Sequence, residues 1–128
     1  MPVNEPRSSV RGERSMSQGF VAQYAAEAAL SAPGVASLDS SGIIALKESM
    51  GVEHEGKGVQ VYFHDDNEGL VTITVYPVVY YGNIMPEVAW KIQELVKADV
   101  ERYTGLMVEQ VNVHIKGIVP PEQEEGRI

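Results

Sequence analysis

The sequence predicts an α+β domain, a two-layer sandwich in which two main helices pack on one face of a small mixed β-sheet. Three observations support this prediction. Two segments have apolar residues at helical spacing, several short segments alternate apolar and polar residues, and a strand, a helix and a strand follow one another over residues 70–118. A crossover helix between two strands can give a parallel pair with a right-handed connection. We therefore expect a mixed sheet.

Both helices are marked by an apolar face and by clear end signals. The first is expected from about Ser17 to Ala32, where Pro33-Gly34 ends it. The second begins near Pro86, whose missing N–H costs nothing in a first turn, and ends at Gly105, which suits a left-handed C-cap. The residues expected on the buried faces are Phe20, Val21, Tyr24, Ala25, Ala28 and Ala29 in the first helix, and Ala89, Ile92, Val96, Val100 and Tyr103 in the second.

Alternation with a period of two marks the strands. Residues 59–64 and 70–76 are expected to form a hairpin, residues 111–117 the final strand, and Val35 to Leu38 a further short strand. Pro77 cannot donate a ladder hydrogen bond, so we expect a bulge or a sheet edge there. The polar side chains of the longer strands share one face, which no predicted helix covers: Gln60, Tyr62, His64, Thr72, Thr74, Tyr76, Asn112, His114 and Lys116.

Length and composition predict one domain between two tails. A chain of 128 residues is most simply a single domain. Residues 1–15 are rich in Pro, Ser, Arg and Glu without an apolar period, and residues 120–128 are acidic, so both tails are expected to be disordered. The α+β domain is expected to occupy residues 16–119.

Charge and cysteine content narrow the function classes. The net charge of −8 disfavours a free nucleic-acid binder, which usually presents a basic face. The absence of cysteine excludes disulfides, thiolate metal sites and cysteine nucleophiles. No apolar run is long enough to span a bilayer, and residues 1–6 lack the apolar core of a signal peptide. We expect a cytoplasmic protein that reaches the membrane, if at all, through a partner rather than by direct insertion.

No constellation of catalytic residues emerges, so we expect a protein without enzymatic activity, cofactor or resident metal. Residues 51–58 (GVEHEGKG) match a phosphate-binding loop except at Gly58, where Ser or Thr normally holds magnesium. Glu53 and Glu55 would repel phosphate, and a strand follows instead of a helix, so a surface loop is the better interpretation. His64 and His114 share the polar sheet face, but such histidines are more often exposed polar residues than metal ligands.

The polar sheet face and one helix residue form the candidate partner-binding surface, unless the face is simply solvated. Tyrosines on an open sheet can stack on RNA bases, but no RNA-binding motif accompanies them, and protein contacts use exposed aromatics equally. Trp90 lies between the apolar stripe and the solvated side of its helix, so it is either boundary packing or a partner anchor. The candidate residues are Tyr62, His64, Thr72, Thr74, Tyr76, Trp90, Asn112 and His114.

Several segments resemble the alkaline shock protein family, the small general stress proteins of the bacterial envelope stress response. They are residues 32–35 (APGV), 57–61 (KGVQV), 81–89 (YGNIMPEVA), 104–106 (TGL) and 111–113 (VNV). Their order and spacing make the resemblance specific. It implies a small cytosolic protein without known catalysis, tied to envelope homeostasis, that self-assembles or docks on a membrane-anchored partner. It carries over no catalytic residue.

The leading hypothesis is a non-enzymatic cytosolic interaction or scaffold protein of the envelope stress response. It would act by self-association and by docking on a protein partner, which can be membrane-anchored. Two alternatives stay open. One is an RNA-binding or ribosome-associated module that uses the open sheet, and the other is a small regulatory subunit of a metabolic enzyme.

Overall fold

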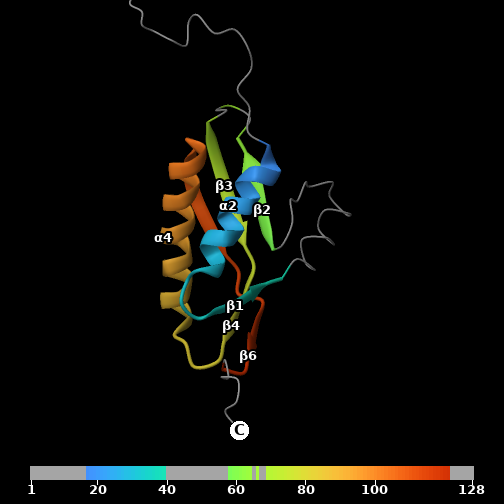
Figure 1. The fold of residues 1–128 in the computed structure, drawn as a ribbon, viewed down its shortest axis with the longest axis vertical. Helices are drawn as coiled ribbons and strands as arrows, with labels where there is room; N and C mark the ends of the chain where they lie inside the picture. Colours follow the sequence, from blue (N-terminus) through green and yellow to red (C-terminus); the bar gives the residue numbers. More distant parts are fainter. Residues whose placement is uncertain (1–16, 40–57, 65, 67–68, 122–128) are drawn as a thin grey trace, which may run out of the picture.

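A computed structural model describes residues 17–39, 58–64, 66 and 69–121 of the chain (Figure 1). Helices α2 and α4 pack against each other and against the same side of the strands, which confirms the predicted α+β class. The elements follow in the order α2 (Gln18–Leu30), β1 (Val35–Leu38), β2 (Val59–Phe63), β3 (Leu70–Val75), β4 (Pro77–Tyr80), α4 (Met85–Thr104), β5 (Met107–Val113) and β6 (Gly117–Val119).

The predicted tails and the predicted surface loop lie mostly outside the described residues. Of the tails at residues 1–15 and 120–128, the structure describes only Pro120 and Pro121, and of the loop at residues 51–58 only Gly58. Among the helices of the described residues, none has the length and apolar character needed to cross a membrane.

The strands are divided into two three-stranded sheets, with the orders β2-β3-β5 and β1-β4-β6. In each sheet the central strand has one antiparallel and one parallel neighbour. Only Tyr76 separates β3 from β4, so these two strands form one nearly continuous path through both sheets. The connection from β3 to β5 through α4 is the parallel crossover that the sequence predicts.

Pro77 lies where the two sheets meet. The expectation of a bulge or an edge at this residue is wrong, because Pro77 is the first residue of β4, a central strand, and is fully buried. The first position of a strand is another place where a missing N–H is tolerated. Its carbonyl still accepts from the backbone N–H of Lys116 at 2.8 Å. Pro77 therefore starts the ladder of the second sheet, where it pairs with Leu38 of β1.

The helix ends follow the signals in the sequence. Ser17 caps α2 by accepting a hydrogen bond from the backbone N–H of Phe20 at 3.2 Å, and Gly105 ends α4 with a left-handed φ of 77°. The buried position expected for Phe20 is wrong, since 58% of its side chain is exposed. Ala22 and Ala26 are buried instead, so α2 packs through a nearly continuous face of small residues.

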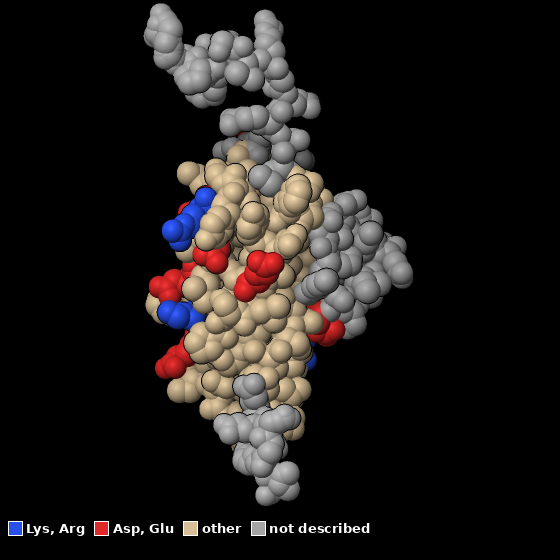
Figure 2. Space-filling model, in the orientation of Figure 1, with Lys and Arg blue, Asp and Glu red and all other residues tan. Residues whose placement is uncertain are grey.

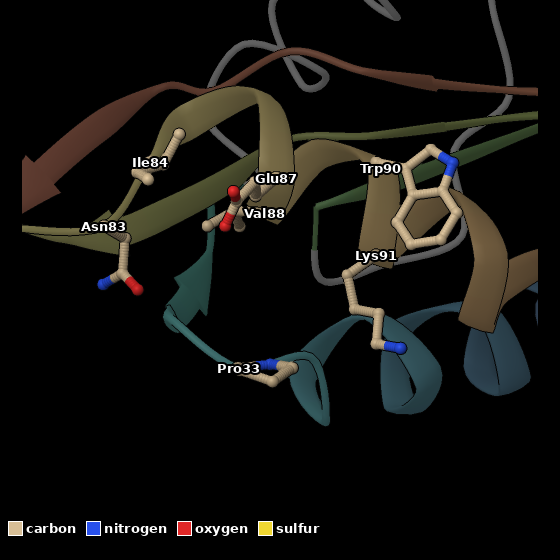
Figure 3. Close-up of a pocket in the computed structure, with 7 residues that line it drawn as sticks. All are labelled: Pro33, Asn83, Ile84, Glu87, Val88, Trp90 and Lys91. Atoms are coloured by element: carbon tan, nitrogen blue, oxygen red, sulfur yellow. The ribbon is translucent and has the colours of Figure 1, made fainter.

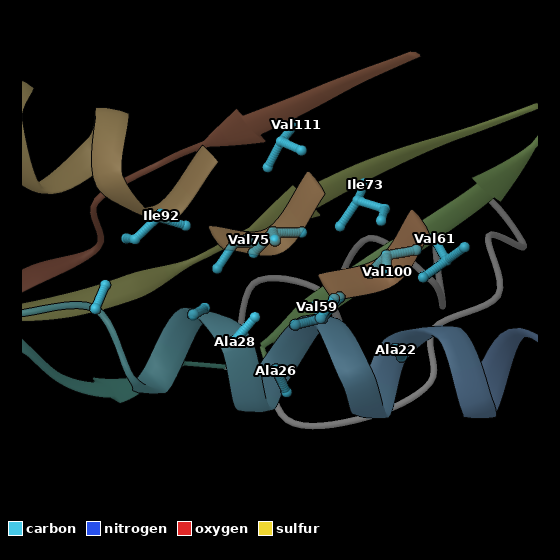
Figure 4. Packing of buried hydrophobic residues seen from close by; sticks show 14 of the residues in the cluster. Ala22, Ala26, Ala28, Val59, Val61, Ile73, Val75, Ile92, Val100 and Val111 are labelled. Atoms are coloured by element: carbon cyan, nitrogen blue, oxygen red, sulfur yellow. The ribbon is translucent and has the colours of Figure 1, made fainter. Parts of the chain in front are cut away.

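The apolar core lies between the helices and the inner face of the sheets (Figure 4). Tyr103, which was also expected in the core, is 55% exposed and stacks on Tyr24 with their ring centroids 5.3 Å apart. In β2 and β3, buried residues alternate with less buried ones, as the sequence predicts. The buried residues of β2, β3, β5 and α4 are Val59, Val61, Val71, Ile73, Val75, Val108, Val111, Val88, Ile92, Val96 and Val100.

A β-bulge in β5 decides which of its residues are exposed. Val71 pairs with Val108, but the next residue, Thr72, pairs with Gln110, so Glu109 is an extra residue in β5. The bulge allows Val108 and Val111 both to be buried, while Glu109 and Gln110 are both exposed. The predicted final strand starts only at Val111, and a count of the alternation from there misses the bulge.

Gly58 packs against the end of β1 with a φ of +85°, and a Cβ at this position would lie 2.5 Å from Leu38 Cβ. We expect Gly58→Ala to lower the free energy of unfolding by about 3 kcal/mol, from backbone strain and overpacking together. Urea denaturation followed by circular dichroism measures this loss.

Gly82→Ala is the matched control, because Gly82 has a φ of +100° but no atom within 4 Å of the added Cβ. Backbone strain alone predicts a loss of about 1 kcal/mol there. Equal losses at Gly58 and Gly82 would contradict the packing argument.

Candidate protein-interaction site

Seven of the eight predicted site residues lie on the face of the β2-β3-β5 sheet that is turned away from the helices. The register places Tyr62 opposite Thr72 and Thr74 opposite Asn112. We call this surface the open sheet face: Tyr62, His64, Thr72, Thr74, Tyr76, Asn112 and His114. Trp90 lies elsewhere, on α4 in the helical layer. The predicted partner-binding residues therefore lie on two separate surfaces, the open sheet face and the part of α4 around Trp90.

At one end of the open sheet face, His64 bridges two strands. Its Nε2 lies 2.8 Å from Thr72 Oγ1 and 3.2 Å from Glu109 Oε1. The Tyr62 ring meets the His64 ring edge-on, with their centroids 5.1 Å apart. Glu109 is the bulge residue of β5, so the bulge that keeps Val108 and Val111 buried also supplies the carboxylate that contacts His64.

At the other end, Tyr76 stacks on His114 with ring centroids 5.5 Å apart. The Tyr76 hydroxyl donates to Gln60 Oε1 at 3.3 Å, and burial raises the pKa of this phenol above its usual range. It therefore stays a neutral hydrogen-bond donor at physiological pH. Between the two ends, Asn112 Nδ2 donates to Thr74 Oγ1 at 3.4 Å. Hydrogen bonds and ring contacts between strands thus fix the side chains of the open sheet face in position.

These contacts bear on the alternative that His64 and His114 bind a metal. His64 contacts Thr72 and Glu109 at one end of the face, while His114 stacks on Tyr76 at the other. The described part of the chain contains no group of three or more His, Asp or Glu side chains arranged to hold a metal ion. The contacts that these side chains make within the protein are ring stacking and hydrogen bonds.

Side chains of α4 cover the outer edge of β5. Lys97 Nζ donates to the carbonyl of Val108 at 3.2 Å, and the N–H of Val108 donates to Glu101 Oε2 at 2.8 Å. Gln93 Nε2 donates to the carbonyl of Val111 at 3.0 Å. Figure 2 shows the basic and acidic groups interspersed along the side of the molecule that α4 forms. The α4 side chains occupy backbone groups that could otherwise pair with another strand.

The other outer strand, β2, has one such bond among the described residues, since Gln18 Nε2 of α2 donates to the carbonyl of Val61 at 3.0 Å. Both outer strands of the sheet are therefore bonded to helix side chains. These helix residues were not among the predicted site residues, but the sequence of α4 contains a signal for them. Gln93, Lys97 and Glu101 repeat at intervals of four, one position after the buried stripe of Ile92, Val96 and Val100.

A groove of about 450 Å³ lies at the start of α4 (Figure 3). Trp90 is 59% exposed here, and Lys91 Nζ lies 5.9 Å from its ring centroid. Lys91 Nζ also lies 3.3 Å from Glu94 Oε1. The groove is lined by Pro33, Asn83, Ile84, Glu87, Val88, Trp90 and Lys91.

The cover over β5 should respond to pH. The hydrogen bonds from Lys97 and from the N–H of Val108 hold the pKa of Glu101 below its ordinary value. A lowered pKa in the folded state stabilises the fold above the unfolded pKa of about 4.3, and this stability is lost as the pH falls through the folded pKa. We expect Glu101→Gln to cost on the order of 1 kcal/mol at neutral pH, given its partial exposure, and much less in acid.

Urea denaturation of the unmodified protein and of Glu101→Gln measures the stability cost of the substitution. It is carried out once at neutral pH and once below the carboxyl pKa. Glu94→Gln is the control, because Glu94 pairs with Lys91 on the exposed surface of α4 and no strand contact is involved. A cost for Glu101→Gln that is the same at both pH values would show that the ionised carboxylate does not stabilise the edge.

Comparison with known proteins gives one family and several relatives. The model of the alkaline shock protein 23 family, described by a cell envelope-related function, matches residues 7–120. YqhY of Bacillus subtilis (strain 168) is 36% identical over 91 residues, which are 71% of this chain and 65% of YqhY. YloU of the same organism is 31% identical over 109 residues, which are 84% of this chain and 88% of YloU. Both relatives are described as uncharacterized proteins.

The chain is also similar to solved structures of MamM-CTD variants. Two of them have TM-scores of 0.48 and 0.45 and sequence identities of 17% and 20%. Each comparison covers 79% of this chain, with 99% and 98% of the MamM-CTD chains. This likeness is too distant to carry an inference.

Proposed function

The chain belongs to the alkaline shock protein 23 family, as its motifs predict, and from this premise we propose that it is a non-enzymatic scaffold of the envelope stress response. It acts by self-association and by docking on a protein partner. The family description, a cell envelope-related function, supports the link to the envelope.

The observation that carries the proposal is an open sheet face that neither described helix covers and whose side chains are held by contacts with one another. Tyr62 is 53% exposed beside His64, while Tyr76 and His114 are held against each other. Side chains that are already held by hydrogen bonds lose less conformational entropy when a partner binds. Aromatic residues are enriched in the cores of protein interfaces. These properties support a contact role for the face over simple solvation.

A second copy of the chain suits this face. Two identical faces can pack around a two-fold axis, so that each copy presents the same residues to the other. Sheets that pack face to face in this way enclose a layer about 10 Å thick. Association through the outer edge of β5 is disfavoured, since α4 side chains already bond three of its backbone groups.

The two alternative functions have less support. RNA binding needs Lys or Arg to neutralise phosphates, but Lys116 is the only Lys or Arg among the residues that the sequence places on this side of the sheet, and Glu109 adds a carboxylate beside His64. The net charge of −8 adds to the repulsion. No contact or charge pattern of the described residues favours a regulatory subunit of a metabolic enzyme over a scaffold.

Replacing Tyr62 by Lys tests self-association. In a two-fold contact this change places a charged side chain from each copy in the interface, so we expect the dissociation constant of the assembly to rise at least about tenfold. Sedimentation velocity over a concentration series measures it. Because Tyr62 is exposed, the free energy of unfolding should stay within about 0.5 kcal/mol.

Phe20→Lys is the matched control, because Phe20 is similarly exposed, at 58% against 53% for Tyr62, but lies in the helical layer. It should assemble like the unmodified protein. An unmodified protein that stays monomeric across the series would refute the proposal, and so would a Tyr62→Lys variant with an unchanged dissociation constant.

A further inference from the structure

The groove at the start of α4 is formed by parts of the chain that are distant in sequence. Figure 3 shows Pro33, from the segment after α2, facing the first turns of α4 across the groove. Asn83 lies at one end, and its Nδ2 donates to the carbonyl of Tyr80 at 3.0 Å, which ties the loop before α4 to the end of β4. Contacts of the fold itself therefore position the groove.

The apolar walls of the groove are exposed. Ile84 and Trp90 are each 59% exposed, and the nearby Tyr81 is 69% exposed. A volume of about 450 Å³ falls in the range of small-molecule pockets, but such pockets bury most of their ligand and their walls. Walls that are more than half exposed fit an occupant that covers them from outside. A segment of polypeptide fits this description, because one or two of its side chains can fill a groove of about 450 Å³ while its backbone stays outside.

The charge at the rim specifies the occupant further. The Glu87 carboxylate, in the first turn of α4, has no hydrogen-bond or ion-pair partner among the residues that the structure describes. Lys91 lies one turn further on, but its ammonium group is paired with Glu94. This part of α4 therefore presents two carboxylates against one ammonium group, so a cationic side chain complements it.

We propose that this groove receives a peptide segment of a partner protein, in which a large apolar side chain packs between Ile84 and Trp90. A Lys or Arg close to that side chain in the partner sequence pairs with Glu87. The inference rests on the proposed docking role and names the chemistry of the partner. It is independent of the open sheet face, because the groove lies in the helical layer. Trp is among the residues that contribute most to binding energy at interfaces.

A random peptide library displayed on phage and selected on the immobilised full chain tests the proposal. The enriched peptides should share a large apolar residue with Lys or Arg within about one helical turn, four positions. A synthetic copy of the most enriched peptide is then titrated by fluorescence anisotropy. We expect Trp90→Ala to weaken its binding at least about tenfold, and Glu87→Gln to weaken it several-fold.

Three controls make the outcome decisive. Phe20→Ala removes an exposed aromatic residue from α2 and should leave the affinity unchanged. Tyr62→Lys should also bind the peptide normally, which separates this site from self-association. Circular dichroism checks that Trp90→Ala is folded, as expected for a residue that is more than half exposed. No enrichment, enrichment without a basic residue, or binding that survives Trp90→Ala would each overturn the proposal.

Discussion

Burial on one side only of the β2-β3-β5 sheet is the constraint on which the rest of the structure depends. Val71, Ile73 and Val75 of β3 are fully buried beneath the helices, so Thr72 and Thr74 must point to the opposite side. A slip of one residue would exchange the two sets, and the register is therefore strongly determined. The alanine face of α2 lets it pack closely beside α4 on the same side. The open sheet face is a direct consequence of how the core is built.

Helix α4 connects the core with both candidate surfaces. Its buried stripe of Ile92, Val96 and Val100 packs on the sheet, and the neighbouring stripe of Gln93, Lys97 and Glu101 bonds the outer edge of β5. Its first turns form the groove beside Trp90. These α4 side chains occupy backbone groups at the outer edge of β5, so fewer of them are left to pair with another strand.

Much of this organisation could be predicted from the sequence, because it depends on local rules. The start of α4 near Pro86, the left-handed Gly105 and the alternation in β2 and β3 are each specified within a few residues. The features that were missed depend on pairing between distant segments. The bulge at Glu109 appears only when β5 is aligned with β3, and the contact between Glu109 and His64 follows from that alignment. Similarly, the groove beside Trp90 needs Pro33, which the packing of α2 on α4 brings close.

The central claim is that the open sheet face is a contact surface, and NMR spectroscopy of the unmodified protein tests it most directly. Amide chemical shifts are followed while the labelled protein is diluted, because residues in a self-association contact shift with concentration. The account predicts concentration-dependent shifts that cluster at Tyr62, Thr72, Asn112 and His114, with Phe20 and Leu30 of α2 unaffected. Shifts confined to the helical layer, or a spectrum that does not change with concentration, would contradict it.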